Sequence, residues 1–220
     1  TLITSSAASD VYKRQGNHFL NPGPGFGGSC FKKDISNLIY ISNHYGLYEV
    51  SEYWQKVIDI NEWQTKRISK QIVEKLFNTI SSKKICILGF AFKANTNDTR
   101  ESPAIKICKE LLEENCKLAI YDPKVNPKQI ENDLKMKQSK TLSKSNTGEW
   151  SFSESIIDAS INSDAVVLIT EWEEFKNINW SQIYKNMRKP AWLFDTRSIV
   201  DIDDVNISGL NFWKIGGGID

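Results

Sequence analysis

The sequence has no long apolar run, little net charge and no clustered cysteines. No stretch of about 18 apolar residues occurs, so no segment is typical of a transmembrane helix. The formal net charge is only +1, which favours neither nucleic-acid binding nor an acidic, disordered chain. The four cysteines stand far apart and lack a CxxC pair. This spacing predicts reduced thiols in a cytoplasmic protein rather than a disulfide framework or a zinc site.

The composition is otherwise that of an ordinary globular protein, except at the start of the chain. The 220 residues are 40% hydrophobic and 25% charged, which fits one large domain or two small ones. Residues 1–15 are small and polar, then basic, and they lack the apolar core of a signal peptide. We expect this leader to be disordered or non-native.

Residues 34–79 carry helical periodicity. Apolar residues recur at three- and four-residue steps from Ile35 to Phe77, as on one face of a helix. Gly46 interrupts the pattern, which predicts one helix ending there and a longer one from about Tyr48. A helix of about 30 residues is about 45 Å long, more than a small domain needs. We therefore expect it to bridge domains or to pack against another subunit.

From residue 84 onward, short apolar runs alternate with amphipathic stretches. This alternation predicts parallel strands with helices on both faces of the sheet. The predicted strands are 84–89, 117–121, 165–170, 192–195 and 210–215. The predicted helices are 104–114, 129–137, 153–161 and 180–187, and residues 138–149 are expected to form a solvated loop. The predicted fold class is α/β: a long-helix segment, residues 16–80, followed by a Rossmann-like parallel-sheet domain, residues 81–220.

The stretch GPGFGGSCFKKD, residues 23–34, is the strongest candidate for chemistry. Four glycines precede Cys30, and glycine lets a backbone turn sharply and approach a ligand closely. If a helix begins at the next residue, its dipole favours the thiolate of Cys30. Asp34, one turn later, either supports that helix as a first-turn acid or orients a water or a lysine beside the thiol.

The other cysteines have a more ordinary interpretation. Cys86 lies in a predicted strand and Cys108 on a predicted helix face, so both are expected in the core. Cys116 is either buried or at the surface. The two histidines, His18 and His44, have no metal-ligand spacing, and no metal site is predicted.

Two segments near the first predicted strand are candidates for binding a nucleotide. Residues 89–93, GFAFK, lack the GxGxxG dinucleotide fingerprint. They form either a tight turn or a nucleotide site in which Phe92 offers a ring and Lys93 a charge. Arg100 precedes a predicted helix N-terminus, a natural anion site. It either reaches a phosphate or pairs with Glu101 in solvent.

A charged pair closes the fourth predicted strand. Asp195 and Arg197 follow its last apolar residues, and ligands of parallel sheets bind at the carboxyl ends of the strands. The pair is therefore placed to bind a ligand, although a structural ion pair would fit this pattern equally well.

Taken together, these segments resemble the UDP-glucose/GDP-mannose dehydrogenase family. The motifs that carry the resemblance follow in the family's order at residues 25–34, 89–93, 98–102, 121–123, 170–172 and 194–197. The resemblance runs from about residue 16 to about residue 215. Several independent motifs in order make it specific, and they are most similar to the branch that oxidises UDP-glucose.

The resemblance implies an NAD-dependent oxidation of UDP-glucose to UDP-glucuronate in two steps. Cys30 would attack the intermediate aldehyde and then carry a thioester that water hydrolyses, a form of covalent catalysis. Asp34 matches an aspartate that helps to position this water. The resemblance also implies a homo-oligomer, because the helices at the centre of family members form their main dimer surface. GDP-mannose or a UDP-N-acetyl sugar is the weaker alternative substrate.

The resemblance also assigns binding residues. Those matched to the substrate are Phe19, Asn21, Gly25, Phe26, Gly27, Phe31, Phe92, Lys93 and Arg197. Those matched to NAD are Cys30, Lys33 and Arg100. Asn21 and Ala94 stand where the animal enzymes have lysine, which leaves the sugar specificity open.

The family's amino-terminal Rossmann domain, with its GxGxxG, has no counterpart in this sequence, and neither do a catalytic lysine and glutamate. We therefore expect the chain to be the carboxyl-terminal part of a longer enzyme and to be inactive alone. The long helix and the absent fingerprint motivate an alternative hypothesis, in which the chain is a non-catalytic UDP-binding and oligomerisation module.

Overall fold

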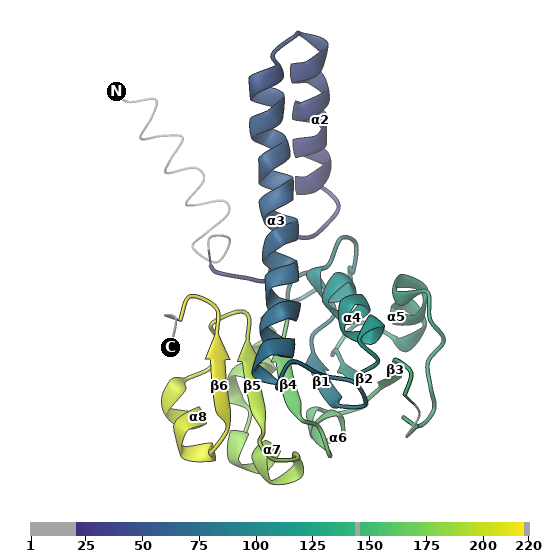
Figure 1. Cartoon of the computed structure of the whole chain (residues 1–220), viewed down its shortest axis with the longest axis vertical. Helices are drawn as coiled ribbons and strands as arrows, with labels where there is room; N and C mark the ends of the chain where they lie inside the picture. Colours follow the sequence, from purple (N-terminus) through teal and green to yellow (C-terminus); the bar gives the residue numbers. More distant parts are fainter. Residues whose placement is uncertain (1–20, 144–145, 218–220) are drawn as a thin grey trace.

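The computed structural model describes residues 21–143 and 146–217, and the structural statements below refer to these residues. The leader at residues 1–15 and Phe19 lie outside the described residues. The described chain has two parts, a helical hairpin and an α/β sheet, and the hairpin stands on the sheet (Figure 1).

The hairpin consists of two antiparallel helices. Helix α2 spans Phe31–His44 and helix α3 spans Tyr48–Lys75, with the turn at Gly46 between them, as predicted. The 28 residues of α3 make it about 42 Å long. Its last turns bury Ile68 and Ile72 in the core, whereas its first turns project away with α2 (Figure 1). No helix in the described part of the chain is both long and apolar enough to cross a membrane.

All six strands of the sheet are parallel. The strands are β1 (Lys84–Leu88), β2 (Lys117–Tyr121), β3 (Glu149–Phe152), β4 (Ala165–Leu168), β5 (Trp192–Asp195) and β6 (Asn211–Lys214). Their order is β3-β2-β1-β4-β5-β6, the doubly wound order of a Rossmann fold. The order reverses between β1 and β4, where Leu88 pairs with Leu168. In sheets of this order, ligands bind at this switch point, outside the carboxyl ends of the strands.

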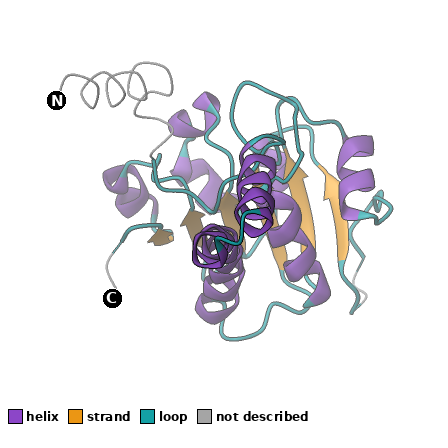
Figure 2. Cartoon of the chain, turned by 90° about the horizontal axis from the view of Figure 1, so that it is seen from above, coloured by secondary structure: helices purple, strands orange, loops and turns teal. Residues whose placement is uncertain are grey.

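Helices cover both sides of the sheet (Figure 2). On one side, α3 contacts α4 (Pro103–Glu113), which contacts α5 (Pro127–Leu134). On the other side, α6 (Ile156–Ser160), α7 (Trp180–Asn186) and α8 (Ile202–Ser208) pack in succession. A short 3₁₀ helix, η2 (Glu173–Asn177), follows β4. The predicted α/β class is therefore confirmed.

The helices begin where the sequence supplies capping side chains. Ser102 Oγ accepts the backbone N–H of Ala104 at 3.3 Å, and Asn126 Oδ1 accepts that of Gln129 at 2.9 Å. A proline follows each of these caps, and its fixed φ and missing N–H suit the first helical position. The helix predicted at 104–114 is therefore present as α4, one residue earlier at each end.

Several predicted boundaries in the sheet part are wrong. The loop predicted at 138–149 ends in β3, an edge strand of four residues, EWSF, in which polar and aromatic residues alternate. The helix predicted at 153–161 is limited to the five residues of α6, and that predicted at 129–137 runs instead from Pro127 to Leu134. Helix α8 was not predicted, because its sequence IDDVNIS has too few apolar residues for a periodic pattern.

Asp122, directly after β2, anchors the loops at the carboxyl edge of the sheet. Its Oδ2 accepts the backbone N–H of Phe90 at 2.7 Å and the indole N–H of Trp172 at 3.2 Å. Its Oδ1 accepts the backbone N–H groups of Lys124 and Val125, both at 2.9 Å. One buried carboxylate thus joins the segments that follow β1, β2 and β4.

Replacing Asp122 with alanine should lower the free energy of unfolding by about 3 kcal/mol, because several buried N–H donors would lose their acceptor together. Asp122→Asn should cost less, because its amide oxygen still accepts. Urea unfolding followed by circular dichroism measures both changes. Asp59→Ala, on the exposed face of α3, is the control and should change stability by less than about 0.5 kcal/mol. Equal stability of Asp122→Ala and the wild type would contradict the anchoring role.

Candidate functional site

A cavity of about 740 Å³ opens at the carboxyl ends of the strands. One wall comes from the segments after β1, β4 and β5, with Phe92, Lys93, Glu171 and Arg197. The opposite wall comes from residues 21–30, called the glycine loop below, and from the first residue of α2 and the middle of α3. The residues of this wall are Asn21, Gly23, Gly25, Phe26, Gly27, Phe31, Val57, Ile60, Asn61 and Gln64. The volume lies within the range of about 300–1,000 Å³ typical of small-molecule sites.

The structure brings together the sequence-predicted substrate residues that it describes. Every one of them lines this cavity: Asn21, Gly25, Phe26, Gly27, Phe31, Phe92, Lys93 and Arg197. They come from two parts of the chain that are separated by the whole of α3. Cys30 does not line the cavity itself, although the next residue, Phe31, does.

Arg197 carries a largely buried positive charge at the edge of the cavity. Its side chain is 15% exposed, its Nε donates to the carbonyl of Ile169 at 2.7 Å, and it lies 3.1 Å from Glu171 Oε2. Burial lowers the pKa of the Arg197 guanidinium, while the negative charges of Glu171 and Asp195 oppose that shift. Arginine stays protonated under such conditions, so the cavity has a fixed cation.

Asp195 has a structural role within this site. Its Oδ1 accepts the backbone N–H of Arg197 and its Oδ2 that of Val200, both at 2.9 Å. Burial raises the pKa of Asp195, while these N–H donors act against the increase. The ion pair of the Arg197 side chain is therefore made with Glu171, which the sequence placed in a motif but assigned no role, and Asp195 shapes the turn beneath it.

The glycine loop lies directly against the segment that follows β1. Gly28 N–H donates to the carbonyl of Arg100 at 2.8 Å. A Cβ added to Gly27 would lie 2.5 Å from the carbonyl oxygen of Glu101, closer than real Cβ atoms come. Only glycine allows this approach, which holds the loop against the edge of the sheet.

Cys30 is the accessible thiol of the chain. It is the residue before α2, its side chain is exposed, and its Sγ lies 3.7 Å from Ser29 Oγ. The other three cysteines are buried, as expected for Cys86 and Cys108, and burial raises the pKa of Cys86 to about 12. Burial also raises the pKa of Cys108 and of Cys116, so these thiols are poor nucleophiles.

The charged residues near Cys30 have different surroundings. Asp34 is exposed in the first turn of α2, where an acid supports the helix, and its N–H donates to the carbonyl of Cys30 at 2.8 Å. Lys33 is exposed in the same turn. Lys32 forms an ion pair with Glu101 at 2.8 Å, which links α2 to the segment before α4.

Arg100 is held by Asp98. Its Nη2 donates to Asp98 Oδ2 at 2.6 Å and its Nε to Asp98 Oδ1 at 2.9 Å. The pairing of Arg100 with Glu101, one of the two alternatives drawn from the sequence, is therefore wrong. The Asp98 hydrogen bond raises the pKa of Arg100, and the nearby Cys30 adds to this shift.

The switch point of the sheet does not fit a dinucleotide. The turn after β1 lacks the GxGxxG fingerprint, and the carboxylate of Asp122, which in such folds binds a ribose, already accepts backbone and indole N–H groups. Cys30, Lys33 and Arg100 are exposed and do not line the cavity. Within residues 21–143 and 146–217, no three His, Cys, Asp or Glu side chains lie close enough to hold a metal ion.

Sequence reasoning missed Asn61, Gln64 and Thr65 on α3, which bind the backbone of the glycine loop. The signal in the sequence is weak, because polar residues on a long amphipathic helix are usually solvated. Their spacing of i, i+3 and i+4, which places them on one face, is the feature that would have marked them.

Models of one family match most of the chain. The UDP-binding domain of the UDP-glucose/GDP-mannose dehydrogenase family matches residues 86–202, and the central domain of the same family matches residues 4–63.

Curated proteins with similar sequences are UDP-glucose 6-dehydrogenases. UDP-glucose 6-dehydrogenase 4 of Arabidopsis thaliana is 44% identical over 228 residues, which cover 100% of this chain and 47% of the relative. The UDP-glucose 6-dehydrogenase of Drosophila melanogaster is 48% identical over 206 residues, which cover 92% of this chain and 43% of the relative. The chain thus spans about half the length of the curated relatives it matches.

Solved structures share the fold. UDP-D-ManNAc dehydrogenase from Pyrococcus horikoshii matches with a TM-score of 0.66 at 28% identity, over 89% of this chain and 40% of that one. GDP-mannose dehydrogenase from Pseudomonas aeruginosa matches with a TM-score of 0.63 at 21% identity, over 90% of this chain and 42% of that one. At 21% identity, the similarity to the GDP-mannose dehydrogenase shows only that the two chains share a fold.

Ellman's reagent should modify one thiol rapidly in the folded chain and four after denaturation, because only Cys30 of the four cysteines is exposed. The absorbance of the released thiolate counts these groups. Cys30→Ser should abolish the rapid phase, and Cys86→Ser, the control, should keep it. A rapid phase that survives Cys30→Ser would show that another cysteine is the accessible thiol.

Proposed function

Because the chain belongs to the UDP-glucose/GDP-mannose dehydrogenase family, we propose that it supplies the nucleotide-sugar half of an NAD-dependent UDP-glucose 6-dehydrogenase. That enzyme oxidises the primary alcohol of the sugar twice and gives UDP-glucuronate. One observation carries the proposal: the loop that ends in Cys30 and the carboxyl ends of β1, β4 and β5 enclose a single cavity.

The charges and rings of the cavity suit a nucleoside diphosphate. Arg197 and Lys93 supply positive charge for the diphosphate, and the ring of Phe92 offers a surface for the uracil base. The glycine loop encloses the sugar, with Asn21 at its start and Phe31 directly after its end. We extend the substrate role to Phe19 as well, which lies outside the described residues.

Cys30 acts as the nucleophile between the two oxidations. Its sulfur forms a bond to the aldehyde carbon, and the carbonyl oxygen gains a proton, which gives a thiohemiacetal. Loss of a hydride and of the hydroxyl proton leaves a thioester, and water then breaks the carbon–sulfur bond to release the acid and the free thiol. Asp34 positions this water from the first turn of α2. NAD, when bound, would supply the hydride acceptor for each oxidation, and Cys30, Lys33 and Arg100 are the residues of this chain that would hold it.

The helical hairpin supports a homo-oligomer. It exposes large aromatic side chains, including Tyr40 at 70%, Tyr45 at 73% and Trp63 at 60%. Exposed apolar residues gathered on one element mark a contact surface, and we propose a second copy of the chain as its partner. The four free thiols support a cytoplasmic location.

Calorimetry with UDP-glucose tests the proposal. The chain should bind UDP-glucose, and Arg197→Met should weaken binding at least about tenfold, because the diphosphate loses a desolvated cation. Arg188→Met is the matched control, because Arg188 pairs with Asp164 at the opposite edge of the sheet and should not affect binding. Absence of binding would contradict the proposal, and tighter binding of GDP-mannose or a UDP-N-acetyl sugar would change its substrate.

A further inference from the structure

A row of polar side chains on α3 binds the backbone of the glycine loop. Gln64 Nε2 donates to the carbonyl of Gly23 at 3.2 Å, and Thr65 Oγ1 donates to that of Pro24 at 3.0 Å. Asn61 lies one turn earlier on the same helix face. These contacts join segments about 40 positions apart, so the loop carbonyls accept hydrogen bonds from the helix instead of from water.

Asn61 makes the most complete contact of the row. Its Oδ1 accepts the N–H of Phe26 at 2.7 Å, and its Nδ2 donates to the carbonyl of the same residue at 3.2 Å. One carboxamide thus satisfies both backbone groups of Phe26, as a neighbouring β-strand would.

The loop residue before Phe26 can only be glycine in this arrangement. Gly25 has φ +135°, and a Cβ there would lie 2.9 Å from both Asn61 Oδ1 and Thr65 Oγ1. The amide of Asn61 and the missing side chain of Gly25 therefore depend on each other.

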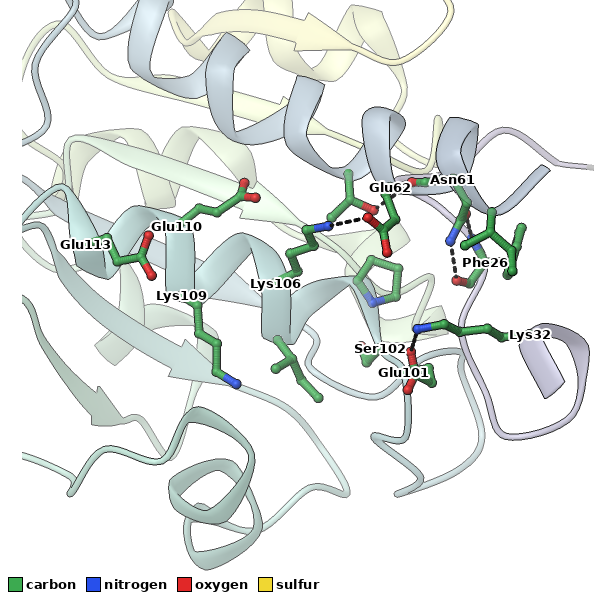
Figure 3. A pocket seen from close by; sticks show the side chains of 14 residues that line it. Phe26, Lys32, Asn61, Glu62, Glu101, Ser102, Lys106, Lys109, Glu110 and Glu113 are labelled. Atoms are coloured by element: carbon green, nitrogen blue, oxygen red, sulfur yellow. Dashed lines mark hydrogen bonds and ion pairs between the residues drawn. The ribbon is translucent and has the colours of Figure 1, made fainter. Parts of the chain in front are cut away.

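Asn61 also stands between two hollows of the surface. It lines the cavity of about 740 Å³ and a second groove of about 490 Å³ between α3 and α4. Figure 3 shows this groove, with the two hydrogen bonds between Asn61 and Phe26 at one end and the ion pairs Lys32–Glu101 and Lys106–Glu62 along it. Loss of the Asn61 side chain would remove a wall that the two hollows share.

We propose that Asn61 is a positioning residue for the nucleotide-sugar site. Its carboxamide fixes the backbone at Phe26, four residues before Cys30, so that the glycine loop forms one wall of the cavity before a ligand arrives. The inference rests on the proposed function for the identity of that ligand. The hydrogen bonds to Phe26 do not depend on it.

Two variants of Asn61 separate its hydrogen bonds from its bulk. Asn61→Leu has a similar size and neither hydrogen bond, while Asn61→Asp keeps the acceptor for the Phe26 N–H and loses the donor. Gln71→Leu is the matched control, because Gln71 lies on the same helix and bonds only to Glu74 among the contacts described. Hydrogen exchange in the segment 24–31 reports on the loop, and calorimetry with UDP-glucose reports on the site.

In Asn61→Leu, the hydrogen-exchange rate of residues 24–31 and the Kd for UDP-glucose should each rise at least about tenfold. Asn61→Asp should show smaller increases, and Gln71→Leu should match the wild type. The melting temperatures should stay within about 5 °C of one another, because the side chain is only half-buried. A merely structural role would not raise the exchange rate and the Kd in the order wild type, Asn61→Asp, Asn61→Leu while the melting temperatures stay similar.

Unchanged exchange and affinity in Asn61→Leu would overturn the proposal, and so would equal changes in Gln71→Leu. If Asn61→Leu fails to fold, the hydrogen-exchange rates of Asn61→Asp and the wild type are compared instead. Equal rates in residues 24–31 of these two proteins would overturn the proposal. If the wild type does not bind UDP-glucose, the proposed function fails, while the exchange measurement still tests the role of Asn61.

Discussion

The close approach of two backbones is the constraint on which the site depends. Gly28 N–H reaches the carbonyl of Arg100 at 2.8 Å, and Gly27 lies so near Glu101 that no other residue fits there. Cys30 follows two residues later and is therefore placed against the sheet by backbone contact rather than by long, flexible side chains. Glu101 itself has φ +53°, a left-handed conformation that costs about 1–2 kcal/mol for a residue with a Cβ. The structure maintains this conformation where the loop and the sheet meet.

The sheet has the Rossmann strand order but uses its switch point differently from a dinucleotide domain. The acid after β2, Asp122, holds the neighbouring loops together and so has no free acceptor to offer a ribose. The positive charge at the cavity comes instead from Lys93 after β1 and from Arg197 after β5, which forms an ion pair with Glu171. The fold thus provides a cavity closed by a loop from outside the sheet, and this loop ends in the exposed thiol of Cys30.

Local patterns in the sequence predicted most of the fold and the parts of the site that lie in motifs. Strands β2 and β5 have the predicted bounds, because each is a short apolar run limited by turn residues. Strand β3 was missed because its four alternating residues are too short a pattern beside a polar loop, and α8 because its sequence is mainly polar. Asn61 was missed because its partner is a backbone group 35 positions away, and the only sign in the sequence is the weak spacing of polar residues on one face of α3.

The central claim of the proposed function is that the sugar of bound UDP-glucose lies next to Cys30. The rate at which iodoacetamide alkylates Cys30, followed by mass spectrometry, tests it most directly. Saturating UDP-glucose should slow this reaction at least about tenfold, because the bound sugar covers the thiol and only the unliganded fraction of the protein reacts. UDP, which lacks the sugar, should slow it much less. An unchanged rate, with calorimetry showing the site to be filled, would contradict the claim.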